Sequence, residues 1–183
     1  MASEVTSEKK DSPGRSGNIL LIGFMGSGKT SVGGELARIM QKAFVDTDER
    51  IEQRMQRTIS EIFSEEGEAA FRDYETQELR RLLKEEPGMI LSVGGGMPVR
   101  KENRELMRQL GTVVYLQAQT DTLLERLQGD DTRPLLQGVD LRERILQLTA
   151  QREDCYRQTA HVCLPTDELT IEEAAREIER IIK

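Results

Sequence analysis

The sequence predicts an α/β fold with three layers, in which a five-stranded parallel sheet lies between two layers of helices. Short apolar segments alternate with longer amphipathic segments from about residue 18 to the end of the chain. This alternation is typical of a parallel sheet whose two faces are both covered by helices. The length of 183 residues suits one hydrophobic core and is too short for two.

Five segments are predicted to be strands because they are short and almost continuously apolar. They cover residues 18–24, 43–46, 89–93, 112–117 and 162–164. Helical spacing of apolar residues predicts helices at residues 29–42, 49–57, 60–66, 69–86, 101–110, 121–128 and 141–159, and after Thr170. Parallel sheets bind ligands at the carboxyl ends of their strands, so functional residues are expected there.

The composition excludes several classes of protein. No apolar run is long enough to span a bilayer, and the first residues lack the apolar core of a secretory signal, which indicates a cytoplasmic protein. The net charge of -7 disfavours a nucleic-acid partner, because such binding depends on Lys and Arg. Cys155 and Cys163 have neither metal nor redox spacing, and His161 is assigned no role.

A glycine-rich loop follows the first predicted strand. Gly23 to Thr30 reads GFMGSGKT and matches the P-loop pattern G-x-x-x-x-G-K-[ST], with a strand before it and a helix after it. Its backbone N–H groups and the helix N-terminus favour a phosphate anion, while Lys29 can reach the β- and γ-phosphates and Thr30 can bind Mg²⁺. The predicted ATP-binding residues are Gly26, Ser27, Gly28, Lys29, Thr30 and Ser31. The loop alone does not separate a kinase from a GTPase or a motor ATPase.

Two carboxylates close the second predicted strand, at Asp46 and Asp48. Residues two apart on an extended chain face the same side. Asp46 is predicted to hold Mg²⁺ through the water shell of the ion. Asp48 is predicted to orient an acceptor hydroxyl or to accept its proton. The alternative is that Asp48 serves only as the N-cap of the following helix.

Five motifs together resemble the shikimate kinase family, in the order and spacing of that family. They are the P-loop, the Asp46–Asp48 pair, Glu66–Arg72 (EGEAAFR), the triplet Gly94–Gly96, and Thr132–Leu136 (TRPLL). The resemblance covers the chain from about Asn18 to its end. It implies the nucleoside-monophosphate-kinase branch of P-loop folds, with a substrate-binding region at about residues 46–80 and a lid at about 129–139.

The resemblance also implies a reaction, which is phosphorylation of the 3-hydroxyl of shikimate by ATP and Mg²⁺ on the chorismate route to aromatic amino acids. Carried over, Asp48 meets the shikimate hydroxyls, and Arg72 and Arg157 hold the shikimate carboxylate. Arg126 is expected near the adenine, and Arg133 is expected to reach the phosphates from the lid. The implied catalytic residues are Asp48, Lys29 and Arg133, and the implied substrate-binding glycines are Gly94, Gly95 and Gly96.

The residues themselves support two of these implied roles, those of Arg72 and Arg133, without the resemblance. Arg72 lies three residues before Glu75, a helical spacing that allows an ion pair and would fix the guanidinium for bidentate binding of a carboxylate. An arginine that arrives with a closing lid, as is expected of Arg133, would stabilise charge on the transferred phosphoryl group. One departure is the loop at residues 165–168 (PTDE), where some family members place a basic residue over the adenine.

Two alternatives stay open at this point. A related kinase could phosphorylate another small hydroxylated metabolite, although a neutral acceptor would not need both Arg72 and Arg157. An inactive nucleotide-binding regulatory module would be expected to lack the base, the Mg²⁺ ligand or the lid arginine, all of which are present. We expect a flexible leader at residues 1–17 and a single P-loop kinase domain at 18–183. We expect a monomer that binds shikimate and ATP, with no nucleic-acid or membrane partner.

Overall fold

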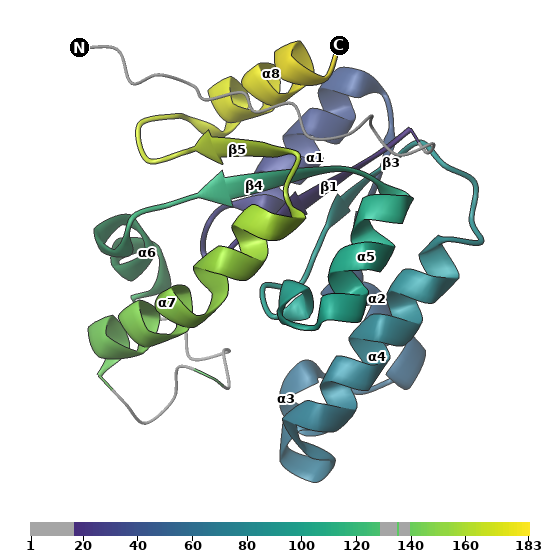
Figure 1. The fold of residues 1–183 in the computed structure, drawn as a ribbon, viewed down its shortest axis with the longest axis vertical. Coiled ribbons are helices and arrows are strands. Elements are labelled where there is room, and N and C mark those ends of the chain that lie inside the picture. The colour runs from purple at the N-terminus through teal and green to yellow at the C-terminus, as the bar shows by residue number, and fades with distance from the viewer. Residues whose placement is uncertain (1–16, 129–134, 136–139) are drawn as a thin grey trace.

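The computed structural model describes residues 17–128, 135 and 140–183. A five-stranded parallel sheet runs through these residues in the order β2-β3-β1-β4-β5 (Figure 1). The strands are β1 (Asn18–Ile22), β2 (Ala43–Asp46), β3 (Met89–Ser92), β4 (Gly111–Gln117) and β5 (Val162–Pro165). The predicted fold class is therefore confirmed. The strand order reverses at β1, and such a reversal opens a crevice beyond the carboxyl ends of the strands.

The helices cover both faces of the sheet. They are α1 (Lys29–Met40), α2 (Thr47–Met55), α3 (Ile59–Glu65), α4 (Gly67–Leu82), α5 (Lys101–Leu110), α6 (Thr120–Leu127), α7 (Leu141–Thr159) and α8 (Ile171–Ile182), with a short 3₁₀ helix, η1 (Met97–Val99). α1 and α8 pack on one face, and α4, α5 and α7 pack on the other (Figure 1). Among the helices that the structure describes, none is long and apolar enough to cross a membrane.

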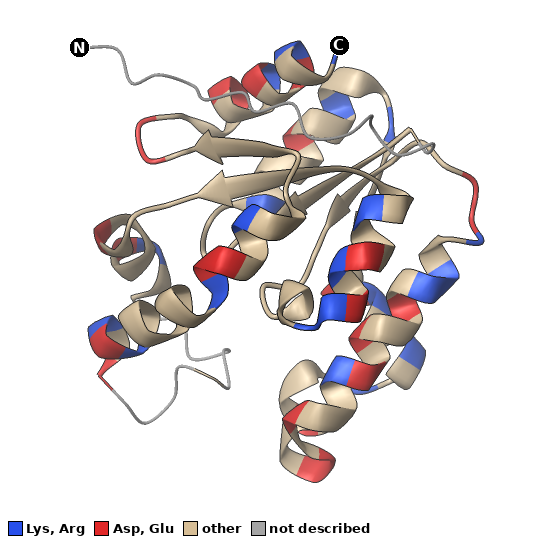
Figure 2. Cartoon of the chain, in the orientation of Figure 1, with Lys and Arg blue, Asp and Glu red and all other residues tan. Residues whose placement is uncertain are grey.

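Alternation along β1 divides the core into two layers. Ile19 and Leu21 pack toward α1 and α8, whereas Leu20 and Ile22 pack toward the opposite helices. All four side chains are almost completely buried, as expected for a central strand with both faces covered. Among the described strand residues only Asp46, at the end of β2, is charged, and charged side chains otherwise lie on helices and loops (Figure 2). A charge at this strand end therefore points to a function.

Asp46, and not Asp48, is the N-cap of α2. The Asp46 carboxylate accepts hydrogen bonds from the backbone N–H groups of Asp48, at 2.9 Å, and Glu49. This cap starts the helix at Thr47, two residues earlier than predicted, because a side-chain acceptor satisfies N–H groups that lack partners in the first turn. The alternative in which Asp48 merely caps the helix is therefore wrong. Asp48 lines a cavity instead.

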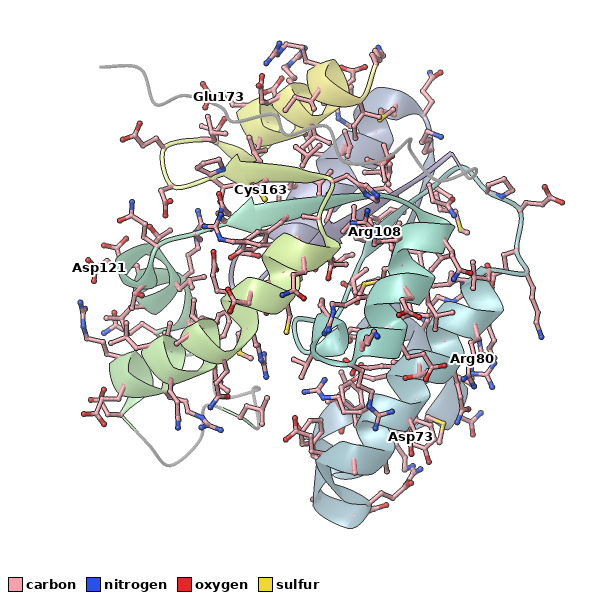
Figure 3. The ribbon with its side chains drawn as sticks, in the orientation of Figure 1. Asp73, Arg80, Arg108, Asp121, Cys163 and Glu173 are labelled. Atoms are coloured by element: carbon pink, nitrogen blue, oxygen red, sulfur yellow. The ribbon has the colours of Figure 1, made fainter. Side chains whose placement is uncertain are left out.

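Helices α2, α3 and α4 form a unit with a small core of its own, made of Ile51, Ile62 and Phe71. A buried carboxylate, Glu78 on α4, holds this unit together by ion pairs with Arg50 and Arg54 on α2. The outer face of α4 carries exposed residues, among them Asp73 and Arg80 (Figure 3). Ion pairs join Arg80 to Glu102 on α5 and Asp73 to Arg100, which directly precedes α5. The start of α2 and the inner face of α4 are thereby held at a fixed spacing.

Candidate active site

A cavity of about 1130 Å³ opens at the carboxyl ends of the strands. Its walls come from the loop after β1, the ends of β2 and β3, and the helices α2, α3, α4, α6, α7 and α8. Its lining includes residues predicted for two different tasks, phosphate binding and acceptor binding. The cavity therefore joins the two predicted sites in one space.

The phosphate loop, Gly23–Thr30, forms one end of the cavity and leads into α1. Gly26 and Gly28 have φ values of 79° and 94°, a left-handed conformation that glycine adopts without strain. Lys29 Nζ lies 3.0 Å from the Gly23 carbonyl oxygen and 2.9 Å from that of Phe24, so its charge sits over the loop. This is the backbone cradle beside a helix N-terminus that binds phosphate groups.

Three oxygen-bearing side chains meet beside the phosphate loop. Thr30 Oγ1 donates a hydrogen bond to Asp46 Oδ2 at 3.0 Å and lies 3.4 Å from Ser92 Oγ. Hydroxyl and carboxylate oxygens are the ligands that Mg²⁺ prefers, and the ion usually keeps several waters and binds phosphate oxygens. The described residues contain no group of three or more His, Cys, Asp or Glu side chains that could hold a metal by themselves. The donor set thus suits an Mg²⁺ ion shared with phosphates.

A charged cluster forms the other end of the cavity and consists of Asp48, Arg72, Glu75 and Arg152. Arg72 Nη1 donates to Glu75 Oε2 at 2.8 Å, and its Nη2 donates to Glu68 at the same distance. The Glu75 side chain is 1% exposed, and burial raises its pKa to about 7 although the charge of Arg72 acts in the opposite direction. The nearby Asp48 carboxylate raises the Glu75 pKa as well.

The glycine triplet, Gly94–Gly96, lies directly against this cluster. A Cβ atom on Gly94 would lie 2.6 Å from Asp48 Oδ1, and one on Gly96 would lie 2.3 Å from the guanidinium nitrogens of Arg72. Any larger residue would displace these two side chains. The glycines are therefore required by the packing of the charged cluster as well as by a bound ligand.

Comparison with known proteins identifies the family to which the chain belongs. A family model described as Shikimate kinase matches residues 25–183. The chain belongs to the shikimate kinase family. Its relatives named Shikimate kinase include one from Nitrosomonas europaea, 45% identical over 81% of this chain and 70% of that protein. Another, from Bacillus cereus strain AH187, is 38% identical over 90% of this chain and 98% of that protein.

Solved structures agree with the shikimate kinase assignment. Shikimate kinase from Acinetobacter baumannii in complex with shikimate superimposes with a TM-score of 0.87 at 38% identity, covering 90% of this chain and 92% of that one. Deoxyadenosine kinase from M. mycoides is similar with a TM-score of 0.58 at 14% identity, over 90% of this chain and 98% of that one, which shows a shared fold alone. The predicted family, fold and ATP-dependent kinase class are confirmed.

Within this shikimate kinase fold, Arg157 does not lie at the acceptor end of the cavity, where its predicted role would place it. Its side chain is 57% exposed, pairs with Glu153 at 2.7 Å and does not line the cavity. Arg152, five residues earlier on α7, lines the cavity instead and is 4% exposed. Its guanidinium carbon lies 5.9 Å from the ring centroid of Phe24, and within the described part of the chain its Nη1 has no hydrogen-bond partner. Arg152 is thus the second arginine of the charged cluster, and the expectation for Arg157 needs this correction.

The helical repeat could have identified Arg152. Leu141, Ile145 and Leu148 recur at helical spacing on the inward face of α7, and the next positions on that face are Arg152 and Tyr156. The predictions for the other two arginines, Arg126 and Arg133, have different outcomes. Arg126 lines the cavity, and its Nη1 donates to the Gly26 carbonyl at 3.2 Å. The predictions for Arg133 and for a lid at 129–139 lie outside the described residues, apart from Leu135.

Proposed function

We propose that this protein transfers the γ-phosphate of ATP to the 3-hydroxyl of shikimate, giving shikimate 3-phosphate and ADP in aromatic amino-acid biosynthesis. The observation that carries the proposal is a pair of buried arginines, Arg72 and Arg152, that face one cavity with Asp48 and a complete phosphate loop. The names of the relatives and the shikimate bound to the related Acinetobacter baumannii enzyme support it.

The phosphate loop binds the triphosphate of ATP in this proposal. Gly26, Ser27, Gly28, Thr30 and Ser31 surround the phosphates, and N–H groups of the loop donate to their oxygens. Lys29 reaches the β- and γ-phosphates and neutralises the charge that develops there during transfer. Arg133 is assigned the same task from the lid, as the sequence predicts.

Arg126 and Ile171 bind the adenine in this proposal. Both line the cavity, and Ile171, at the start of α8, is 50% exposed. A planar guanidinium and an aliphatic side chain both pack well against the flat face of a base. These contacts replace the basic residue that the loop at 165–168 lacks, and the base preference follows from stacking and shape.

Thr30 and Asp46 hold Mg²⁺ in this proposal, Thr30 through its hydroxyl and Asp46 through water. The ion would supply charge neutralisation for the β- and γ-phosphates. Asp46 also caps α2, so the same carboxylate fixes the start of the helix on which Asp48 lies. The position of Asp48 is thereby coupled to the nucleotide end of the cavity.

The charged cluster binds and orients the acceptor. Arg72 and Arg152 bind the shikimate carboxylate, because two buried guanidinium groups at one wall form a site for a small carboxylate. Asp48 accepts a hydrogen bond from the acceptor hydroxyl and aligns it for attack on the phosphoryl group. Gly94, Gly95 and Gly96 let the backbone approach the ring closely.

A coupled assay of ADP release tests this function, with shikimate and its methyl ester as matched acceptors. We expect shikimate-dependent ADP release, and a much weaker response to the ester, which keeps the hydroxyls and loses the carboxylate charge. Equal turnover of acid and ester would favour a kinase for another hydroxylated metabolite. ATP binding without turnover of any hydroxy acid would favour a regulatory module.

The remaining expectations concern partners and location. We expect a cytoplasmic monomer. Its net charge of -7 disfavours nucleic acid and anionic membrane surfaces as partners. Sedimentation of the full chain tests the monomer, with a single species near 20.8 kDa as the expected result.

A further inference from the structure

We propose that the Tyr156 hydroxyl is a positioning group for the acceptor site, because it fixes the glycine triplet next to Arg152. This inference rests on the function proposed above. Tyr156 does not line the cavity, so it would act only through the groups that it contacts, among them the Gly95 carbonyl and Arg152.

The first observation is the hydrogen bond that joins α7 to the glycine triplet. Tyr156 Oη donates to the Gly95 carbonyl oxygen at 2.6 Å, between residues 61 positions apart in the sequence. The tyrosine is completely buried. Arg152 lies one helical turn earlier on the same face of α7, so one short stretch of helix carries both the guanidinium and this hydroxyl.

The second observation is a complete account of the carbonyl groups of the triplet. The Gly94 carbonyl accepts from Met97 N at 3.0 Å and the Gly96 carbonyl accepts from Val99 N at 3.1 Å, both within the 3₁₀ turn. The middle carbonyl, that of Gly95, accepts from Tyr156. Buried carbonyl groups need partners, and the local turn supplies only two of the three. The Tyr156 hydroxyl supplies the third from another element.

The third observation is that Gly95 is closely packed, so that any shift of its backbone would disturb neighbouring groups of the site. A Cβ atom on Gly95 would lie 3.2 Å from the Gly23 carbonyl oxygen and 3.4 Å from Met25 N, both in or beside the phosphate loop. Its neighbour Gly96 packs against the Arg72 guanidinium. A shift of the Gly95 peptide therefore changes the place of Arg72, and the loss of Tyr156 Oη frees that peptide to shift.

The hydroxyl is suited to this task because it stays a donor. Burial raises the pKa of Tyr156 to about 12, and the charge of Arg152 together with its hydrogen bonding to the phenol only partly opposes this effect. The phenol is therefore protonated over the whole range of pH in which the enzyme can be assayed. The hydrogen bond from Tyr156 to the Gly95 carbonyl is therefore independent of pH over this range.

A neighbouring tyrosine provides a matched control. The ring of Tyr115, on β4, packs against the ring of Tyr156 with centroids 5.0 Å apart. The Tyr115 hydroxyl bonds to Glu153, which pairs with the exposed Arg157, so it faces away from the cavity. Tyr115→Phe and Tyr156→Phe thus remove the same atom from two touching rings, and only one of those atoms holds the triplet.

The experiment compares the two variants with the unaltered enzyme in KM for shikimate, KM for ATP, kcat and melting temperature. For Tyr156→Phe we expect KM for shikimate to rise about tenfold, the effect of one lost hydrogen bond to a buried acceptor. We expect KM for ATP to stay within about twofold, because Gly95 only borders the phosphate loop, which keeps its own bonds from Lys29 to the Gly23 and Phe24 carbonyls. For Tyr115→Phe both KM values should stay within about twofold at a comparable change in melting temperature.

A role in core packing alone would appear as equal effects of the two variants, or as a folded Tyr156→Phe with an unchanged KM for shikimate. Either result overturns the proposal. If Tyr156→Phe melts near the assay temperature, calorimetric binding of shikimate at a lower temperature must give the same ratio of affinities. Failure of the proposed function is seen separately, as absence of shikimate-dependent ADP release in the unaltered enzyme.

Discussion

The phosphate loop at the nucleotide end of the cavity is one continuous stretch of chain, whereas the charged cluster at the acceptor end is assembled from three helices far apart in the sequence. The phosphate loop, Gly23–Thr30, is shaped by local hydrogen bonds, among them those from Lys29 to the Gly23 and Phe24 carbonyls and from Ser27 N to the Phe24 carbonyl. The charged cluster takes Asp48 from α2, Arg72 and Glu75 from α4, and Arg152 from α7. The phosphate loop can therefore keep its shape when distant residues change, whereas the charged cluster depends on the packing of every helix that contributes to it.

The two ends also differ in how they handle charge. The phosphate loop attracts anions through backbone dipoles and one lysine at the cavity wall. The charged cluster buries ionisable groups against one another, and the loss of one member leaves another without compensation. Substitutions at the nucleotide end should therefore act on turnover, whereas substitutions in the cluster should act first on acceptor affinity.

The largest effect is expected from Lys29→Met. Removing this charge should lower kcat by about a thousandfold, because a preorganised cation beside the transferred phosphoryl group is worth about 4 kcal/mol. Calorimetric binding of shikimate should change little, since Lys29 belongs to the phosphate loop. A large loss of shikimate affinity in this variant would show that the two ends are not separate.

The next largest effect is expected from Arg152→Met, with Arg157→Met as its matched control. Loss of the buried guanidinium should raise KM for shikimate about a hundredfold, the effect of losing a charge-assisted contact to a carboxylate. Arg157 is exposed and pairs with Glu153, so its loss should leave KM within about twofold. The opposite ranking would return Arg157 to the acceptor site and remove Arg152 from it.

This pair of arginines also explains how far sequence alone can go. The phosphate loop was predictable because its pattern, strand and helix are adjacent, and the structure gives it the expected local form. Arg157 is assigned by resemblance, but it lies five residues after Arg152 on α7, which turns its side chain by about 140° around the helix, from the cavity wall to solvent. Extending the apolar repeat from Ile145 and Leu148 would have reached Arg152 and Tyr156. Their meeting with Gly95 depends on tertiary packing, for which the sequence has no local signal.

A smaller effect is expected from pH, through Glu75. Its pKa is raised to about 7 from an ordinary 4.5, chiefly by burial. Its contribution to stability is therefore full below pH 4.5 and is lost as pH rises through about 7. A bound carboxylate beside Arg72 adds negative charge and favours the protonated form of Glu75. Acceptor affinity should fall over the same rise in pH.

The measurement is KM for shikimate between about pH 6 and 8 at saturating ATP, where we expect a rise of about fivefold for a proton-linked site. Glu75→Gln keeps an oxygen acceptor for Arg72 and cannot ionise, so its KM should be flat over this range. A flat profile in the unaltered enzyme, or the same slope in Glu75→Gln, would contradict this linkage. Either result would mean that the charged cluster keeps one charge state throughout.

The smallest effect is expected at the adenine, where a single aliphatic contact is removed by Ile171→Ala. The side chain is 50% exposed and lines the cavity, so its truncation should raise KM for ATP about threefold through lost apolar contact, with KM for shikimate unchanged. Leu146→Ala is the control, because Leu146 is 48% exposed on α7 and does not line the cavity. If both variants leave KM for ATP unchanged, the base is held elsewhere, and the affinity of the nucleotide end for ATP comes mainly from its phosphate loop.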